Sequence, residues 1–441
     1  MNVLLLTIDC LRHDKVGYVA GRTDLTPNID RFGQEATVFT QAIAQSYTTY
    51  TSFPSIFTST YPNLQQGSWP KKPVLSGQPT LAALLGEQGF ATGGFHSNPW
   101  LSTHFGYGQE YDLYEDNLLP SAIPSSSKGT LRLSRVLHAV YPYRPAGKVT
   151  AQALSWIRQQ RDPFFAWIHY MDAHGPYLSS RQLPMWLGHV LGWSLYRKAQ
   201  NRPEAITPSE RQVLLNRYEG GVRFVDRVLG TLWRELESSG QLGDTLVIIT
   251  ADHGEAFGEH GHFTHGHVHL FDEVLRVPLV VRWPGQETVP QVSGQTELTT
   301  IVPTVLDALG LQIPDHVVGR SAVPWLLGEV SSEETISTEA ISSGRITEQY
   351  ASVSVRTGEW KYIIRRSMTR QSREVELYHL ASDPDEQVEC SQRYPEVSAQ
   401  MNQRAEAHVH RVLEGTTPAA EEGEELPEEV VARLRALGYM D

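Results

Sequence analysis

Short and almost continuously apolar segments recur along the chain, and each is followed by polar residues. A run of this kind is typical of a strand that is buried on both faces of a mostly parallel sheet. Between these runs lie segments whose apolar residues recur with helical spacing. The alternation predicts a doubly wound α/β fold, in which ligands bind beyond the carboxyl ends of the strands. The predicted strands are residues 3–8, 163–169, 245–250 and 277–283, and the predicted helices are residues 27–36, 211–238 and 299–309.

The ends of the predicted helices carry recognisable signals. Thr26 and Pro27 indicate an N-cap followed by proline at the first helical position. Glycines at 240 and 243 interrupt the second helical segment, and Gly310 ends the third. These boundaries support strand–helix units in the first three quarters of the chain.

The pattern changes after about residue 335. Three short runs at 351–356, 360–365 and 375–380 predict antiparallel strands. The acidic run 419–429 predicts a solvated linker, and residues 430–439 predict a short last helix. We therefore expect a large α/β catalytic domain over residues 1–335, a small C-terminal α+β subdomain over residues 336–415, and an acidic linker with a terminal helix over residues 416–441.

Composition narrows the classes of protein that need to be considered. The 441 residues include 37 Lys and Arg against 50 Asp and Glu, which gives a formal charge of −13. This balance argues against a nucleic-acid partner, although it permits a local anion pocket. Two cysteines are too few for a disulfide framework, and the first ten residues do not resemble a secretory signal. We predict a cytoplasmic protein without a membrane-spanning segment.

One apolar segment, residues 183–196, lies outside the strand and helix pattern. Such a segment can form a lid over a substrate or a surface that touches lipid. It can also form an inserted helical hairpin that buries its own core. We favour the hairpin, so membrane contact through this segment is not expected.

Two of the predicted strands end on side chains that bind metals. Asp9 follows the first strand, and Asp252 and His253 follow the strand at 245–250. Carboxylate oxygens together with an imidazole suit a divalent cation such as Mn, Zn or Mg, and leave positions for substrate oxygens. Each group alone is also explained by a turn or a helix cap.

A segment rich in hydroxyl groups lies between these strands. Residues 46–60 concentrate Ser and Thr just before an apolar helical stretch. The amides and the dipole at a helix start favour an anion, while a hydroxyl group can attack it. A capped helix start with an ordinary Ser/Thr loop is the alternative.

Together, these segments resemble the sulfatase family within the alkaline phosphatase superfamily. The resemblance runs nearly end to end, which is more specific than any short motif. It implies an alkaline-phosphatase-like fold and hydrolysis of a sulfate ester with the help of one divalent metal ion, which can be Mn, Zn, Ca or Mg. The matching segments are LLTIDCLRHD, TPNIDRF, SFPSIFTSTYP, HYMDAHGPY, YEGGVRFVD, TLVIITADHGEAFGEHG, FDEVLRVPLVVRWPG, VPTVLDALG, RTGEWKYI and ELYHLASDPDE.

The resemblance assigns the nucleophile and the metal ligands. Counting back from the landmark Thr58-Ser59 places the catalytic nucleophile at Thr49. The metal ligands implied by the family are Asp9, Thr49, Asp252 and His253.

The resemblance also implies contacts with the substrate. His174 matches a family histidine that contacts the transferred anion. Counted back from FDEVLRVP, His267 falls where many sulfatases place a lysine for the same task. Either histidine could instead protonate the leaving oxygen. Ser52 occupies the fourth position of the nucleophile motif and is predicted to bind substrate.

Departures from the family pattern concern the nucleophile and one ligand. Typical sulfatases oxidise Cys or Ser in a Cys-x-Pro-x-Arg context to formylglycine. Thr49 cannot become that aldehyde, because its β carbon bears a methyl group, and Phe53 replaces the motif arginine. A competing register makes Ser52 the modified residue, but its spacing to Thr58 is three residues too short. Cys10 stands where sulfatases often have another metal-binding Asp.

The departures keep more than one reaction open. The main prediction is cleavage of a sulfate or phosphate ester by Thr49 through a covalent intermediate. An unmodified threonine is similar to relatives such as phosphoglycerol transferases, so phosphoryl transfer and hydrolysis of a phosphonate or phosphodiester are alternatives. A catalytically silent homologue that binds an anion is disfavoured, because Asp9, Asp252 and His253 are all present. The substrate class is an anionic small-molecule, glycan or lipid ester.

Five histidines cluster within ten residues of the chain. A second metal ion is conceivable there, but the DAHGP segment lacks the Asp-x-x-x-His spacing that such a site generally supplies. We interpret the cluster as a loop at the rim of the pocket, and we interpret Asp172 and Glu255 as ligand-orienting residues or solvated turn acids. The five are His260, His262, His265, His267 and His269.

Overall fold

The computed structural model describes most of the chain. The described residues are 1–62, 77–117, 143–161, 163–177, 185–265, 269–285, 291–347 and 349–414, together with 430, 431, 434, 435 and 437.

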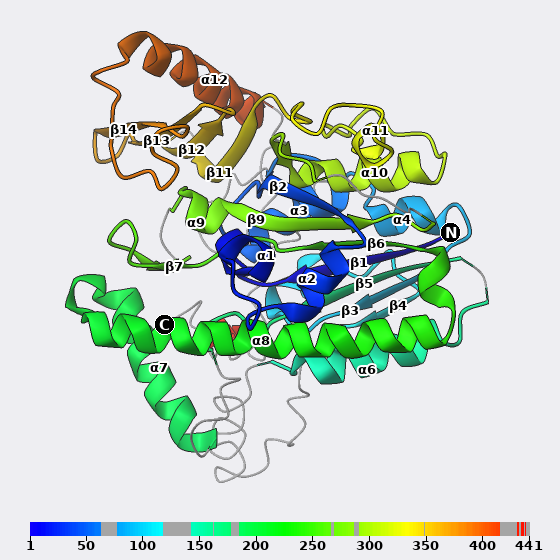
Figure 1. Cartoon of the computed structure of the whole chain (residues 1–441). Helices are drawn as coiled ribbons and strands as arrows, with labels where there is room; N and C mark the ends of the chain where they lie inside the picture. Colours follow the sequence, from blue (N-terminus) through cyan, green and yellow to red (C-terminus); the bar gives the residue numbers. More distant parts are fainter. Residues whose placement is uncertain are drawn as a thin grey trace.

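An eight-stranded sheet forms the centre of the molecule (Figure 1). The strand pairings are parallel except at β9 (Arg276–Arg282), which runs antiparallel to both of its neighbours. The predicted doubly wound, mostly parallel sheet is therefore confirmed. The order of strands is β10 (Thr296–Glu297), β2 (Thr37–Ile43), β9, β6 (Thr245–Thr250), β1 (Asn2–Ile8), β5 (Phe164–Tyr170), β3 (Ala91–Phe95) and β4 (Leu113–Glu115).

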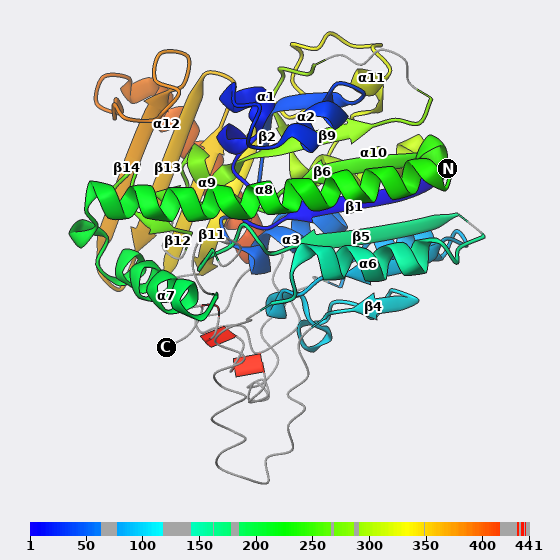
Figure 2. The ribbon, with the colours of Figure 1, turned by 60° about the horizontal axis from the view of Figure 1, so that its bottom comes forward.

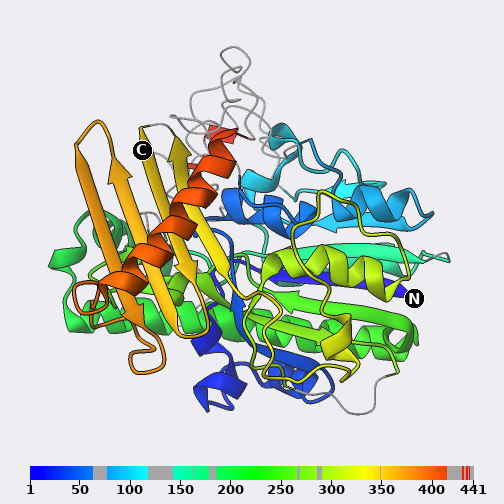
Figure 3. The ribbon, with the colours of Figure 1, turned by 90° about the horizontal axis from the view of Figure 1, so that it is seen from above.

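Helices cover both faces of this sheet (Figure 1, Figure 3). The long helix α8 (Pro208–Ser238) crosses one face beside α2 (Pro27–Gly33) and α6 (Ala146–Ile157), and Figure 2 shows α8 and α6 along the sheet. The other face carries α3 (Thr49–Thr58), α4 (Leu81–Gly86) and α10 (Ile301–Ala308). The strands β1, β5 and β6 are almost wholly buried between these layers, as their continuous apolar runs predict. Shorter elements are α1 (Gly17–Ala20), α9 (Asp272–Leu275), α11 (Val323–Leu326), β7 (Ala256–Phe257) and β8 (Phe263–Thr264).

A second, antiparallel sheet lies beside the main one in the C-terminal part. It has the order β11 (Ala340–Thr347), β12 (Tyr350–Arg356), β13 (Trp360–Ser367) and β14 (Ser372–His379). Helix α12 (Pro395–Glu414) packs diagonally across one of its faces (Figure 3). The sequence pattern predicted three of these strands but neither β11 nor α12. The boundaries of three separate domains remain a prediction, and the acidic run 419–429 lies outside the described residues.

Two local expectations differ from the structure. Helix α2 ends at Gly33 rather than at residue 36, and Thr26 does not cap it with its side chain. The Thr26 hydroxyl instead accepts a hydrogen bond from the Gly17 amide at 2.6 Å and donates one to Asp30 at 2.9 Å. The Thr26 hydroxyl therefore bonds to the Gly17 amide and the Asp30 side chain, and not to a backbone amide in the first turn of α2.

The apolar segment 183–196 is only partly described. Helix α7 (Met185–Asn201) covers most of it and leads by way of a short turn into α8 (Figure 2). In the parts of the chain that the structure describes, no helix has both the length and the apolar character that crossing a membrane requires.

Candidate active site

Two neighbouring strands bring the predicted metal ligands together. Strands β1 and β6 pair in parallel with Thr7 opposite Thr250, so the residues that follow each strand emerge side by side at the carboxyl edge. Asp9 follows β1, and Asp252 and His253 follow β6; all three side chains are completely buried. One ligand atom from each lies within 4.8 Å of the others. A bound cation requires ligand atoms that are grouped as closely as these three.

Thr49 lies at the first residue of α3, next to this group. Its Oγ1 donates to Asp9 Oδ2 at 3.3 Å and lies 3.4 Å from His253 Nε2. The residue is 1% exposed. Because Thr49 begins a helix, amide groups of the first turn and the helix dipole are directed at the same point, which favours an anion there.

The ring orientation of His253 follows from its second nitrogen. Nδ1 lies 2.8 Å from the carbonyl oxygen of Gly254, which can only accept, so Nδ1 carries the proton. Nε2 then presents its lone pair towards Asp9 and Thr49. This is the arrangement that orients a histidine ligand for a metal.

The buried carboxylates have opposite electrostatic environments. Burial alone would raise the pKa of Asp9, but His174, His169 and His253 outweigh it and hold the pKa far below its ordinary value. Burial and the nearby Asp9 charge raise the pKa of Asp252. Asp252 Oδ2 is also buried without a hydrogen-bond partner among the described residues. Two adjacent buried carboxylates, one with an unpaired oxygen, fit a divalent cation.

Asn98 and His169 support Asp9 from neighbouring strands. Asn98 follows β3 and donates its Nδ2 to Asp9 Oδ2 at 2.9 Å. His169, near the end of β5, places Nε2 at 3.3 Å from the same oxygen. Its Nδ1 pairs with the Thr7 hydroxyl at 2.9 Å, and Trp167 donates to that hydroxyl at 3.0 Å. Sequence analysis missed both residues, although each lies at the carboxyl end of a strand.

A second group of side chains adjoins Asp9. Cys10 has a left-handed backbone with φ of 61°, and its Sγ lies 3.2 Å from Asp9 Oδ1 and 3.5 Å from His265 Nδ1. His265 also pairs with Glu255 at 3.1 Å, and its ring centroid lies 5.0 Å from that of His174. All of these residues are buried. Ligand atoms of Asp9, Cys10 and His174 lie within 4.8 Å of one another.

His265 therefore has a different place from the one that the sequence suggested. We predicted a loop at the pocket rim for the whole histidine cluster, but the His265 ring lies within the buried site, 4.4 Å from the His253 ring between centroids. Burial lowers the pKa of His265, but Glu255 outweighs it, so the pKa is raised overall. His267, the residue chosen by counting, lies outside the described residues.

The remaining predicted residues have other contacts. Ser52 Oγ donates to the carbonyl oxygen of Ser46 at 3.0 Å, so this hydroxyl holds the loop before α3. Asp172 accepts from the Ala146 amide at 2.9 Å, and burial raises its pKa to about 7. Glu255 accepts from Tyr177 at 2.9 Å. Neither acid is a solvated turn residue, because both are buried.

Phe53, which replaces the motif arginine, belongs to the core. Its ring packs edge to face against Phe57, Trp167 and His169, with centroids 5.1–5.4 Å apart. No guanidinium group is therefore available at this position to bind the anion. Aromatic packing instead fixes α3 against β5, and with it the position of Thr49.

Two family models match this chain. The family model "Sulfatase" matches residues 1–311, and the model "N-sulphoglucosamine sulphohydrolase, C-terminal" matches residues 258–411. Arylsulfatase K of Bos taurus is 31% identical over 196 residues, which are 42% of this chain and 34% of the relative. N-acetylglucosamine-6-O-sulfatase of Bacteroides thetaiotaomicron is 31% identical over 135 residues, 30% of this chain and 24% of the relative. The chain thus matches about a third or less of the length of these curated relatives.

A solved structure extends the likeness over nearly the whole fold. Phosphonate monoester hydrolase of Agrobacterium radiobacter superposes with a TM-score of 0.71 at 21% identity, covering 93% of this chain and 96% of that one. This likeness concerns the fold. The match of the family model over residues 1–311, on a fold of this kind, shows that the chain belongs to the sulfatase family of the alkaline phosphatase superfamily.

Proposed function

We propose that this chain hydrolyses a sulfate or phosphate-type ester, with a divalent metal ion and with the unmodified hydroxyl of Thr49 as the nucleophile. The observation that carries the proposal is the position of Thr49 Oγ1, 3.3 Å from Asp9 Oδ2 and 3.4 Å from His253 Nε2 at the start of α3. This position places the hydroxyl beside one buried acid and one buried histidine, both of them proposed metal ligands.

The metal-binding residues in this proposal are Asp9, Asp252 and His253. Their fit rests on the unpaired Asp252 Oδ2 and on the closeness of the two carboxylates. A cation held there would supply the positive charge that favours an alkoxide at Thr49 and that balances the oxygens of the anion.

The chain's own groups then perform a displacement in two stages. The Thr49 hydroxyl is oriented by its hydrogen bond to Asp9 Oδ2 and loses its proton to water as it attacks. Oγ1 forms a bond to sulfur or phosphorus, while the bond from that atom to the ester oxygen breaks. The leaving oxygen takes a proton, and water later attacks the same sulfur or phosphorus atom and releases Thr49.

His174 and His265 are the candidates for protonating the leaving oxygen. Nδ1 of His174 lies 2.6 Å from the Gly175 carbonyl oxygen, and Nδ1 of His265 lies 3.1 Å from a carboxylate oxygen of Glu255. Both Nδ1 atoms therefore carry protons, so each ring exchanges a proton at Nε2. We add His265 to the predicted catalytic set for this reason.

The type of ester follows from the nucleophile and the relatives. The curated relatives named above are sulfatases, one of them acting on N-acetylglucosamine 6-O-sulfate by its name, whereas the similar solved structure is a phosphonate monoester hydrolase. We propose an anionic ester of a small molecule or glycan as substrate. An alkoxide suits phosphorus, and sulfate cleavage here would proceed without a formylglycine hydrate.

The test uses the full chain loaded with Mn²⁺ and three aryl substrates: a sulfate, a phosphate and a phosphonate monoester. Thr49→Ala should lose activity by a factor of about 10³ or more, because the nucleophile is removed. Thr48→Ala is the matched control, since Thr48 precedes the helix and its hydroxyl pairs with Thr51 at 2.8 Å. It should retain the activity of the unaltered chain.

Mass spectrometry of the quenched reaction gives an independent readout. We expect one sulfo or phosphoryl group on the peptide that contains Thr49, and an otherwise unmodified peptide. Full activity of Thr49→Ala would refute the proposal. So would an aldehyde at Ser52 in the same peptide.

A further inference from the structure

A second set of metal-binding side chains lies outside the candidate active site. His260, His269 and Glu273 offer ligand atoms within 4.8 Å of one another. His260 Nδ1 lies 2.7 Å from Glu273 Oε1, and His269 Nε2 lies 2.8 Å from the same oxygen. Glu273 belongs to the first turn of α9, and His269 precedes that helix. Both ring nitrogens thus converge on one carboxylate oxygen.

The outer hydrogen bond of His260 fixes which nitrogen points to that position. Its Nε2 lies 3.0 Å from the backbone carbonyl oxygen of Glu386 and 3.3 Å from the side-chain nitrogen of Gln387; the shorter contact is to an oxygen that can only accept, so Nε2 donates. In a neutral ring the lone pair is then on Nδ1, directed at Glu273. Histidine ligands of metals are typically oriented in this way, with the second nitrogen donating to a carbonyl or carboxylate.

Glu386 is itself held in place to present that carbonyl. Its backbone is in the left-handed region with φ of 56°, and its carboxylate pairs with Lys361 Nζ at 2.7 Å and accepts from the Asp272 amide at 2.6 Å. The Phe271 ring stacks on His260 with 3.7 Å between centroids and 5° between planes. The His260 ring is therefore fixed in position and orientation from both sides.

Without a cation, the three side chains need an additional proton. Glu273 Oε1 accepts from both rings, and His260 has to donate from both of its nitrogens at once, which only the imidazolium form can do. His269 Nδ1 is buried and has no partner among the described residues. A divalent cation bound between these three side chains would replace the protons on His260 Nδ1 and His269 Nε2 that are directed at Glu273.

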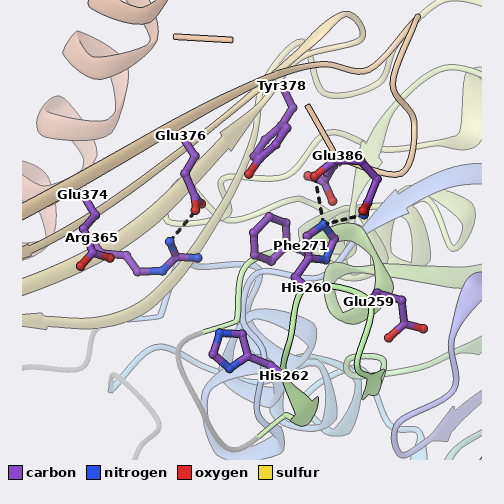
Figure 4. A pocket seen from close by; sticks show the side chains of 10 residues that line it. Glu259, His260, His262, Phe271, Arg365, Glu374, Glu376, Tyr378 and Glu386 are labelled. Carbon is purple, nitrogen blue, oxygen red and sulfur yellow. Dashed lines mark hydrogen bonds and ion pairs between the residues drawn. The ribbon is translucent and has the colours of Figure 1, made fainter. Parts of the chain in front are cut away.

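One of the three side chains, His260, lines a cavity of about 550 Å³ (Figure 4). His260 and Phe271 lie in its wall, between the main sheet and the strands β13 and β14. Four carboxylates also line it, and three of them are paired: Glu376 with Arg365 at 3.0 Å, Glu386 with Lys361 at 2.7 Å and Glu259 with Arg12 at 2.6 Å. The four acids are Glu259, Glu374, Glu376 and Glu386.

We propose that His260 Nδ1, His269 Nε2 and Glu273 Oε1 bind a borderline divalent cation, of which Zn²⁺ is the type, with further positions occupied by water from the cavity. Two imidazoles and one carboxylate suit zinc better than calcium or magnesium, which prefer oxygen ligands. The site is separate from the catalytic metal and independent of the proposed hydrolysis. Through the Glu386 carbonyl, it links the segment before β9 to the C-terminal subdomain.

The experiment counts bound zinc on the full chain. Chelator-treated protein is equilibrated with Zn²⁺, passed through a desalting column and analysed by elemental mass spectrometry. His269→Ala and Glu273→Gln should each retain one zinc equivalent less than the unaltered chain. Asp252→Asn should lose a different equivalent, so that Asp252→Asn with His269→Ala loses both.

His410→Ala is the matched control, because His410 and Glu414 form an exposed i,i+4 pair at 3.0 Å on α12, similar in spacing to His269 and Glu273. It should retain the full zinc content. Co²⁺ replaces zinc in a second measurement, in which His269→Ala should remove part of the visible absorption. Circular dichroism verifies that each variant is folded. If His269→Ala does not fold, Glu273→Gln tests the site in its place. Equal zinc content in the unaltered chain and a folded variant would overturn the proposal.

Discussion

At the scale of single residues, burial decides what the polar side chains of the site do. Asp9, Asp252 and His253 are fully buried, and a buried charge is tolerated only when it is paired or bound to an ion. Thr49, the first residue of α3, lies beside these side chains. Ser52, three residues later, donates its hydroxyl to the backbone carbonyl oxygen of Ser46. Similar hydroxyls of one segment thus have different roles because the helix turns them in different directions.

Asn98 gives a prediction at this scale. Asn98→Asp should weaken metal binding by roughly 10–100-fold, because Asp9 Oδ2 loses the donor that orients it. The variant keeps the side-chain oxygen that accepts from the Trp100 amide at 2.9 Å, so the local turn is retained. Metal affinity is measured by titration of the chelator-treated chain with Mn²⁺.

The control for this measurement is Asn216→Asp, which makes the same chemical change on an exposed part of α8. It should leave the affinity unchanged. An affinity of Asn98→Asp within twofold of the unaltered chain would show that Asn98 does not support Asp9.

At the scale of elements, close packing between a helix and a loop determines the position of His174. Gly221 of α8 lies against the backbone of Asp172, and a Cβ atom there would overlap the Asp172 carbonyl oxygen. The loop from Asp172 to His174 follows β5 and supplies one wall of the site. Helix α8 therefore reaches this wall of the candidate site through close backbone packing.

Gly221→Ala should destabilise the fold by about 1–3 kcal/mol, which is typical of an overpacked contact. It should also reduce kcat, because the loop that carries His174 has to move. Urea unfolding measures the first effect, and hydrolysis of the best aryl substrate measures the second.

Gly243→Ala serves as the comparison, since a Cβ atom at Gly243 meets nothing within 4 Å. It should alter neither quantity. If Gly221→Ala behaves in the same way, the contact between α8 and the loop is not tight.

At the scale of the whole molecule, one buried acid joins the two sheets. Glu297 ends β10 and accepts hydrogen bonds from the Ile341 amide of β11 at 2.9 Å and from Tyr61 at 3.1 Å. Burial raises its pKa to about 7, although these donors partly oppose the shift. The neutral carboxyl group is therefore the form that the fold favours.

This shift predicts how stability depends on pH. A raised pKa in the folded state means that the contribution of the neutral form is complete below pH 4.5 and is lost as the pH rises through 7. Glu297→Gln cannot ionise. Relative to the unaltered chain, it should gain about 3 kcal/mol of unfolding free energy between pH 5 and pH 9.

Urea unfolding at several pH values measures this difference. Glu414→Gln, an exposed residue at the end of α12, is the control and should show a flat difference. A flat difference for Glu297→Gln as well would mean that Glu297 already ionises freely in the folded chain.

The order of polar and apolar residues predicted much of this molecule. The buried runs of β1, β5 and β6 were found because a strand covered on both faces is apolar throughout. Asp9 and the Asp252–His253 pair were found because residues at the carboxyl ends of neighbouring parallel strands meet. Thr49 needed the family resemblance to fix its position in a segment of many hydroxyls.

Other features were outside the reach of pattern analysis. Strand β11 and helix α12 were missed, and His265 was assigned to the pocket rim, although its ring is buried beside His253. His267, which was selected by counting along the chain, lies outside the described residues and stays a prediction. Asn98 and His169 carry no motif, and only their contacts with Asp9 reveal them.

The sequence by itself therefore determined the class of fold, the family and the two strand ends at which Asp9, Asp252 and His253 lie, since local periodicity and end-to-end motifs are properties of the chain. Only the tertiary structure decided which histidines meet the acids, which hydroxyl points at them and where His260 and His269 converge on Glu273. The physical reason is that side-chain contacts depend on distances across the fold, and segments far apart in the chain set those distances when the core packs.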